Sequence, residues 1–142
     1  MSWNKQEKWV RRHNTFSVEV LHWRTDDRTE EEGESPNNNM WNVYAKIYEG
    51  HPRYALFVGS DMFQSAAEAL PLHGGSTYLT KQYDGYYSLY KVGSDYAHYR
   101  DDRFRRFSTE AEAHEVFADA DELFIFLLNE VKETPNDSPT LP

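Results

Sequence analysis

Residues 113–131 read AHEVFADADELFIFLLNEV, and this stretch decides the fold class because it carries the clearest periodic pattern in the chain. Apolar side chains recur every three or four residues, at Ala113, Val116, Phe117, Ala120, Leu123, Phe124, Leu127, Leu128 and Val131. That spacing places them on one face of an amphipathic helix. Thr109 and Glu112, just before the stretch, have the spacing of a capping box. We therefore expect a long C-terminal helix that lies across one face of a sheet.

Four segments upstream of this helix have the character of strands. Apolar and polar residues alternate in residues 14–24 and again in residues 41–48, which predicts two strands that pair as a hairpin. Asp84-Gly85 is a strong signal for a second hairpin, between strands expected at 77–83 and 86–93. Between the two hairpins, residues 61–70 have helical spacing, and Pro71 ends that helix.

The order of these elements, β-β-α-β-β-α, predicts an α+β fold. We expect a four-stranded, mainly antiparallel sheet with the long C-terminal helix packed on one face. The 142 residues suffice for one domain, which we place at residues 14–132. Residues 1–13 form an N-terminal segment for which a short helix is one option. The acidic loop at 26–39 is expected to be mobile and the tail at 133–142 disordered, because both offer little apolar surface to bury.

Composition narrows the classes of function. The formal net charge is -9, which disfavours generic binding of duplex DNA through its phosphates. There is no cysteine, so disulfides and thiolate metal sites are excluded, in agreement with a reducing compartment. No apolar run approaches the roughly 20 residues that cross a bilayer, and no secretory signal follows Met1. We expect a cytoplasmic protein without a membrane partner.

Histidines and carboxylates follow the predicted strands and are the candidates for chemistry. His73, His98, Asp95 and Asp101 combine imidazole nitrogens with carboxylate oxygens, which suits zinc or another first-row divalent ion as cofactor. A short helical turn would also align Asp95 and His98 with Asp102. Alternatively, His73, His98 and Asp95 are catalytic, with a histidine as general base beside a carboxylate. The competing interpretation is that these side chains only cap turns, pack against the core or pair with neighbouring arginines.

A second group of residues could bind a small ligand. Gly74 and Gly75 allow a close approach of backbone N–H groups, and we group them with His51, Arg100 and Arg103 as ligand-binding candidates. Arginines interleaved with aromatic residues can hold a phosphate and stack a base. The alternative is that the aromatic residues anchor this loop to the core while the arginines stay solvated.

Tyrosines are numerous on the predicted strands, at Tyr44, Tyr48, Tyr78, Tyr83, Tyr86, Tyr87 and Tyr90. Tyrosine offers a rigid contact area with a polar tip, so an exposed tyrosine face could bind a protein. Tyrosine is also a good strand former, and this explains the pattern equally well.

Three short motifs follow one another in the chain. They are Gly50-His51-Pro52 with Tyr54, then Leu72-His73-Gly74-Gly75 with Thr77-Tyr78, then Val92-Gly93 with Asp95, Ala97-His98 and Asp101. In this order, over roughly residues 41–130, they resemble a family of uncharacterised small bacteriophage and prophage proteins. The chain departs from that pattern at Ser94, where an aromatic is expected, and at Arg100, where glycine is expected. The resemblance implies a phage origin and one shared rim that holds His51, His73, Asp95, His98 and Asp101. It implies no activity.

Three functions follow, in order of preference. The first is a phage-type accessory protein that binds a host or phage protein in the host cytoplasm. The second is a metal-assisted or general-base hydrolase that uses the His/Asp rim. The third is a small-ligand or nucleotide-binding module.

Overall fold

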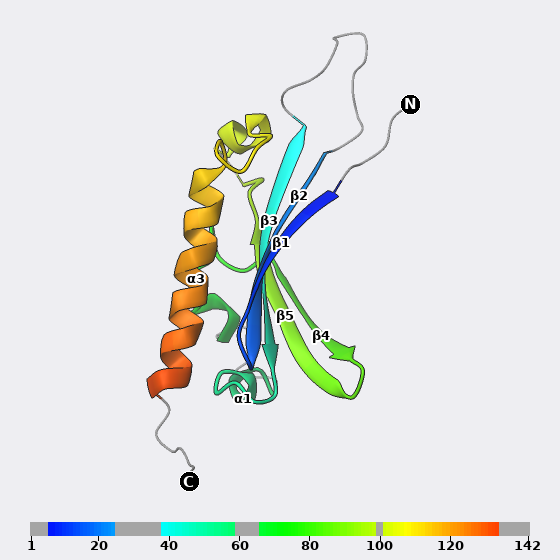
Figure 1. Ribbon diagram of the computed structural model, residues 1–142, viewed down its shortest axis with the longest axis vertical. Helices are drawn as coiled ribbons and strands as arrows, with labels where there is room; N and C mark the ends of the chain where they lie inside the picture. The colour runs from blue at the N-terminus through cyan, green and yellow to red at the C-terminus, as the bar shows by residue number, and fades with distance from the viewer. Residues whose placement is uncertain (1–5, 25–37, 59–65, 99–100, 134–142) are drawn as a thin grey trace.

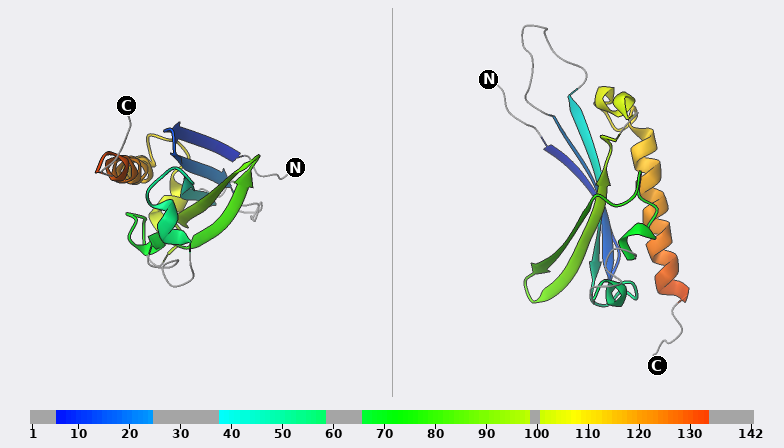
Figure 2. Two further views of the ribbon diagram at one scale, coloured as in Figure 1. Left: turned by 90° about the horizontal axis from the view of Figure 1, so that it is seen from below. Right: turned by 180° about the vertical axis from the view of Figure 1, so that it is seen from behind.

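The computed structural model describes residues 6–24, 38–58, 66–98 and 101–133. Five antiparallel strands form one twisted sheet in the order β1-β2-β3-β5-β4, and the long helix α3 lies along one of its faces (Figures 1 and 2). The elements are β1 (Gln6–Arg12), β2 (Phe16–Arg24), β3 (Asn39–Tyr48), α1 (Tyr54–Phe57), β4 (Tyr78–Asp84), β5 (Tyr87–Asp95), the 3-10 helix η2 (Asp102–Arg106) and α3 (His114–Glu133). This confirms an α+β fold with an antiparallel sheet and a C-terminal helix.

The sheet has five strands, so the expectation of four is wrong. The additional strand is β1, in the N-terminal segment for which a short helix was an option. It pairs with β2 from Gln6 opposite Trp23 to Arg12 opposite Ser17. Trp9 decides its position, because the ring stacks on that of Trp41 at 6.0 Å and meets Phe117 of α3 edge-on at 5.1 Å. A segment with so few apolar residues has no clear period, so pairing with β2 determines its structure.

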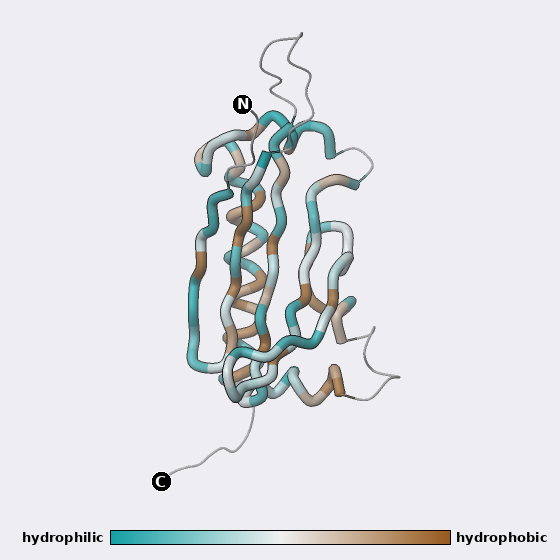
Figure 3. Tube along the Cα trace, turned by 90° about the vertical axis from the view of Figure 1, so that its right-hand side faces the viewer, coloured by the Kyte–Doolittle hydropathy of each residue, from teal (hydrophilic) through white to brown (hydrophobic). Residues whose placement is uncertain are grey.

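The two expected hairpins are both present. β2 pairs with β3 so that Val20 lies opposite Val43 on the face toward α3, and both side chains are buried. β4 pairs with β5 up to Asp84 opposite Tyr87, and the turn residue Gly85 has a φ of 65°. A left-handed first position is what a tight hairpin turn requires. Figure 3 shows the sheet from the side away from α3, with hydrophilic and hydrophobic residues alternating along the strands.

α3 covers β2 and β3 with the apolar stripe seen in the sequence, and Val116, Leu123 and Leu127 are completely buried. The capping pattern ahead of it is present. The Glu112 N–H donates to Thr109 Oγ1 (3.1 Å), and the Glu112 carboxylate accepts the N–H of Ser108 (2.9 Å). Within the described ranges, no helix is both long and apolar enough to span a membrane.

Three expectations fall at least half outside the described residues. They are the acidic loop, of which only Asn38 and Asn39 are described, the tail at 133–142, of which only Glu133 is described, and the first half of the helix expected at 61–70. Of that helix, residues 66–70 are described, and 66–68 are helical while 69 and 70 form a turn. The short helix α1 was not expected.

Candidate functional site

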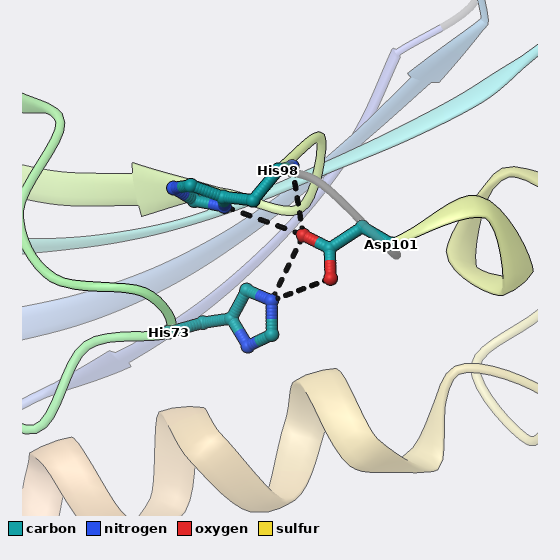
Figure 4. Close-up of side chains that lie close together, drawn as sticks. All are labelled: His73, His98 and Asp101. Carbon is teal, nitrogen blue, oxygen red and sulfur yellow. Dashed lines mark hydrogen bonds and ion pairs between the residues drawn. The ribbon is translucent and has the colours of Figure 1, made fainter.

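His73, His98 and Asp101 converge beside the end of β5 (Figure 4). His73 comes from the turn that precedes β4, and the other two come from the loop between β5 and η2. His73 Nε2 lies 2.9 and 3.0 Å from the two oxygens of Asp101, and His98 Nδ1 lies 3.3 Å from Asp101 Oδ2. One ligand atom of each residue lies within 4.8 Å of the other two. We call these three residues the His–Asp cluster.

Asp101 is the centre of the His–Asp cluster. Its side chain is only 8% exposed, and the backbone N–H of His98 donates to its Oδ2 at 2.8 Å. Burial alone would raise the pKa of this carboxyl. The hydrogen bonds from the His98 N–H and from His73 favour the ionised form, and together they hold the pKa below its usual value.

The ring of His73 is fixed by aromatic neighbours. It stacks on Tyr96 at 4.3 Å with an interplanar angle of 12° and meets Phe104 edge-on at 5.4 Å. Tyr96 is itself buried, and its hydroxyl donates to Asp119 Oδ2 of α3 at 2.6 Å. Burial and this bond raise the pKa of Tyr96 far above its ordinary value, so its phenol stays protonated. His73 is thus tied to α3 through Tyr96.

Gly74 makes room for the ring of His98. Its φ is +68°, and a Cβ built there would lie 2.9 Å from His98 Cε1 and Nε2. The other nitrogen of that ring, Nδ1, faces Asp101 and also lies 3.6 Å from Asp95 Oδ1. His98 Nε2 is buried and has no hydrogen-bond partner among the residues that the structure describes.

Asp95 lies at the margin of the cluster. Its side chain is 40% exposed, and it accepts the N–H of Ala97 at 3.2 Å, as in an Asx turn. The residues from Asp95 to His98 are not helical, so the expected alignment of Asp95, His98 and Asp102 is wrong. Asp101 takes the place proposed for Asp102, which is exposed at the start of η2.

His51 does not share a rim with His73 and His98, and that expectation is wrong. It follows the C-terminal end of β3, whereas β5 ends at Asp95 opposite Asn42, near the start of β3. His51 is 1% exposed, its Nδ1 accepts the N–H of Arg53 (2.9 Å), and its Nε2 donates to the carbonyl of Leu127 (3.0 Å). This histidine therefore fastens the end of the sheet to α3, and burial lowers its pKa.

The arginines of the proposed ligand site are placed only in part. Arg103 forms a two-point ion pair with Glu115 of α3 at 3.1 Å, and its guanidinium lies over the ring of Phe104. Arg100 lies outside the described residues. Gly75, with a φ of +88°, faces open space. Because Arg103 is already paired with Glu115, this arrangement fits a loop anchored to the core better than a phosphate-binding site.

Sequence reasoning missed Tyr96 and Asp119, which hold His73 in place. A signal was available only for Tyr96, which stands between Asp95 and His98 in the third motif.

Comparisons with protein-family models, with curated proteins and with solved structures gave no match.

Proposed function

We propose that this protein binds a first-row divalent metal ion, with Zn²⁺ as the best fit, through His73, His98 and Asp101. The observation that carries the proposal is the convergence of two imidazole nitrogens and one carboxylate from segments about 25 residues apart in the chain. Two histidines with a carboxylate are a known ligand set of catalytic zinc sites.

Two of the three separations between these atoms are close to those of a tetrahedral site. Bonds of about 2.0 Å place neighbouring ligand atoms about 3.3 Å apart. His98 Nδ1 and His73 Nε2 lie 3.3 and 2.9 Å from Asp101 Oδ2. To bind the ion, His73 would carry its proton on Nδ1, because Nε2 must offer its lone pair.

Three protein ligands leave one position open, and this supports a hydrolytic function. A water molecule on zinc has its pKa lowered to about 7 and becomes a nucleophile at neutral pH. The side chains of His73 and His98 are 24% and 31% exposed, so the cluster lies next to the surface. We infer that the reaction is metal-assisted hydrolysis.

Metal titration of the full chain tests the proposal. Calorimetry with Zn²⁺ should give one site per chain, and Co²⁺ should give the visible absorption of a tetrahedral complex. His73→Ala, His98→Ala and Asp101→Asn should each weaken binding by tenfold or more, by analogy with losses on the order of 10–100-fold at supporting residues. His114→Ala is the matched control, because His114 is exposed on α3.

Absence of saturable binding, or binding that the three substitutions leave unchanged, would refute the metal site. Hydrolysis of test esters or phosphodiesters that persists in a chelator would instead favour His73 as a metal-free general base oriented by Asp101.

As a second candidate, we propose a phage-type accessory role in which the tip of the β4–β5 hairpin binds a host or phage protein. Tyr83, Tyr86 and Tyr87 at this tip are 71%, 100% and 64% exposed, and tyrosine is enriched where proteins bind one another. Affinity capture with the wild-type chain and with the Tyr83→Ser and Tyr86→Ser variants tests this role. A partner that both variants retain would contradict binding through the hairpin tip.

A further inference from the structure

A pocket of about 500 Å³ lies at the end of the sheet away from the His–Asp cluster. Its walls come from the turn between β1 and β2, the end of β3 and the β4–β5 hairpin. Figure 1 shows these three segments at the same end of the sheet as the C-terminal end of α3. The volume falls in the range of about 300–1,000 Å³ that is typical of pockets for small molecules.

Buried polar groups that lack partners are concentrated around this pocket. In the part of the chain that the structure describes, six buried side-chain nitrogen or oxygen atoms have no hydrogen-bond partner. Three of them, His13 Nδ1, Thr15 Oγ1 and Ser17 Oγ, belong to residues that line the pocket. Such groups are rare in proteins because leaving them unpaired is costly. The hydroxyls of Thr15 and Ser17 are buried as they stand, so a change of χ1 would be needed for either to reach a ligand.

Two carboxylates in the pocket wall are held by neighbouring hydroxyls. Glu49 Oε2 accepts the hydroxyl of Ser88 at 2.7 Å, and Asp84 Oδ2 accepts the hydroxyl of Tyr48 at 3.3 Å. Each bond uses one oxygen of the carboxylate, and the second oxygen has further capacity to accept hydrogen bonds. Hydrogen bonds to carboxylates are among the strong ones in proteins.

The charge of the wall selects among ligand classes. Glu49 and Asp84 oppose the single guanidinium of Arg12, so phosphates and other anions are disfavoured. Tyr48 and Tyr87 add aromatic surface to which the C–H groups of a ligand can pack. The wall therefore fits a neutral molecule that has many hydroxyl donors and an apolar face.

We propose that this pocket binds a neutral carbohydrate. Ligand hydroxyls donate to Glu49 and Asp84 and accept from Arg12, and a sugar ring packs on Tyr87. The proposal is independent of the metal site, because no residue of the pocket belongs to the His–Asp cluster.

The test is saturation-transfer NMR on the full chain with glucose, galactose, mannose, N-acetylglucosamine and their disaccharides, each at about 10 mM. At that concentration a site with a Kd of about 1 mM is mostly occupied. At least one sugar should bind, and calorimetry should show one site per chain. Glu49→Gln and Tyr87→Ala should each weaken binding by about tenfold, as expected for the loss of one strong contact. Tyr83→Ala is the matched control, because Tyr83 is exposed on the same hairpin but does not line the pocket.

Three results with the wild type and the pocket variants would overturn the proposal. They are the absence of binding by every sugar in the panel, binding that Glu49→Gln and Tyr87→Ala leave unchanged, and binding of inorganic phosphate in preference to the sugars. Loss of metal binding in His73→Ala without loss of sugar binding would support two separate sites. Loss of sugar binding in that variant would contradict the assignment to this pocket.

Discussion

Replacing Gly74 by alanine tests how the His–Asp cluster is built. The new Cβ would lie 2.9 Å from the His98 ring, whereas ordinary contacts between such atoms are 3.4 Å or longer. Alanine at a φ of +68° costs about 1–2 kcal/mol. If the ring stays in place, the overlap destabilises the folded chain by about a further 1–3 kcal/mol. If the ring moves instead, it shifts by about half an ångström, and metal–ligand distances tolerate only about 0.2 Å. We therefore expect Gly74→Ala to weaken Zn²⁺ binding by roughly 10–100-fold.

Gly75→Ala is the matched control for this substitution. Gly75 also has a positive φ, of +88°, but a Cβ there meets nothing within 4 Å. Gly75→Ala should therefore cost only the backbone strain, about 1–2 kcal/mol, and keep the affinity for Zn²⁺. Urea denaturation gives the stabilities, and calorimetry gives the affinities. The reasoning is refuted if Gly74→Ala binds Zn²⁺ as tightly as the wild type, or if both variants lose affinity equally.

Three further predictions concern stability. Asp101→Ala should lower the free energy of unfolding by about 3 kcal/mol, because the buried carboxylate accepts bonds from two partly buried donors, the His98 N–H and His73 Nε2. The exposed control Asp102→Ala should change it by at most about 0.5 kcal/mol, and equal losses in urea denaturation would contradict this. Burial lowers the pKa of His51 in the folded chain, so the unfolded chain takes up a proton first as the pH falls. The free energy of unfolding should therefore decrease as the pH drops below 6.5, by up to about 1.4 kcal/mol per pH unit. His51→Gln should remove that part of the slope, and an unchanged slope would show that another group is responsible. Tyr96→Phe should lower the free energy of unfolding, measured by thermal denaturation, by about 1–2 kcal/mol, because it removes the hydrogen bond from the Tyr96 hydroxyl to Asp119 of α3. A more stable variant would contradict the role given to this hydroxyl.

The sequence predicted the elements whose signals are local. The apolar stripe of α3, the alternation in β2 and β3, and the turn at Gly85 each depend on residues that are neighbours in the chain. A helix or strand that buries one face repeats its apolar residues with a fixed period, and a tight turn needs a residue that accepts a positive φ. These patterns were sufficient for an antiparallel sheet covered by a C-terminal helix.

The same kind of reasoning brought together only part of the site. The order of the second and third motifs indicated that His73, His98 and Asp101 could meet, and the structure places them in contact. His51 carried an equally strong motif, but it lies at the other end of β3 as a buried structural residue. A motif records which residues are present, and it does not say at which end of an antiparallel sheet each of them lies.

Only the tertiary structure decided the rest. β1 is a strand because β2 offers it an edge and because Trp9 packs between Trp41 and α3. The pocket at the opposite end joins residues near positions 15, 49 and 85, and no spacing along the chain connects them. Strand order and register set such distances, and they result from burying the whole core at once rather than from any local stretch of sequence.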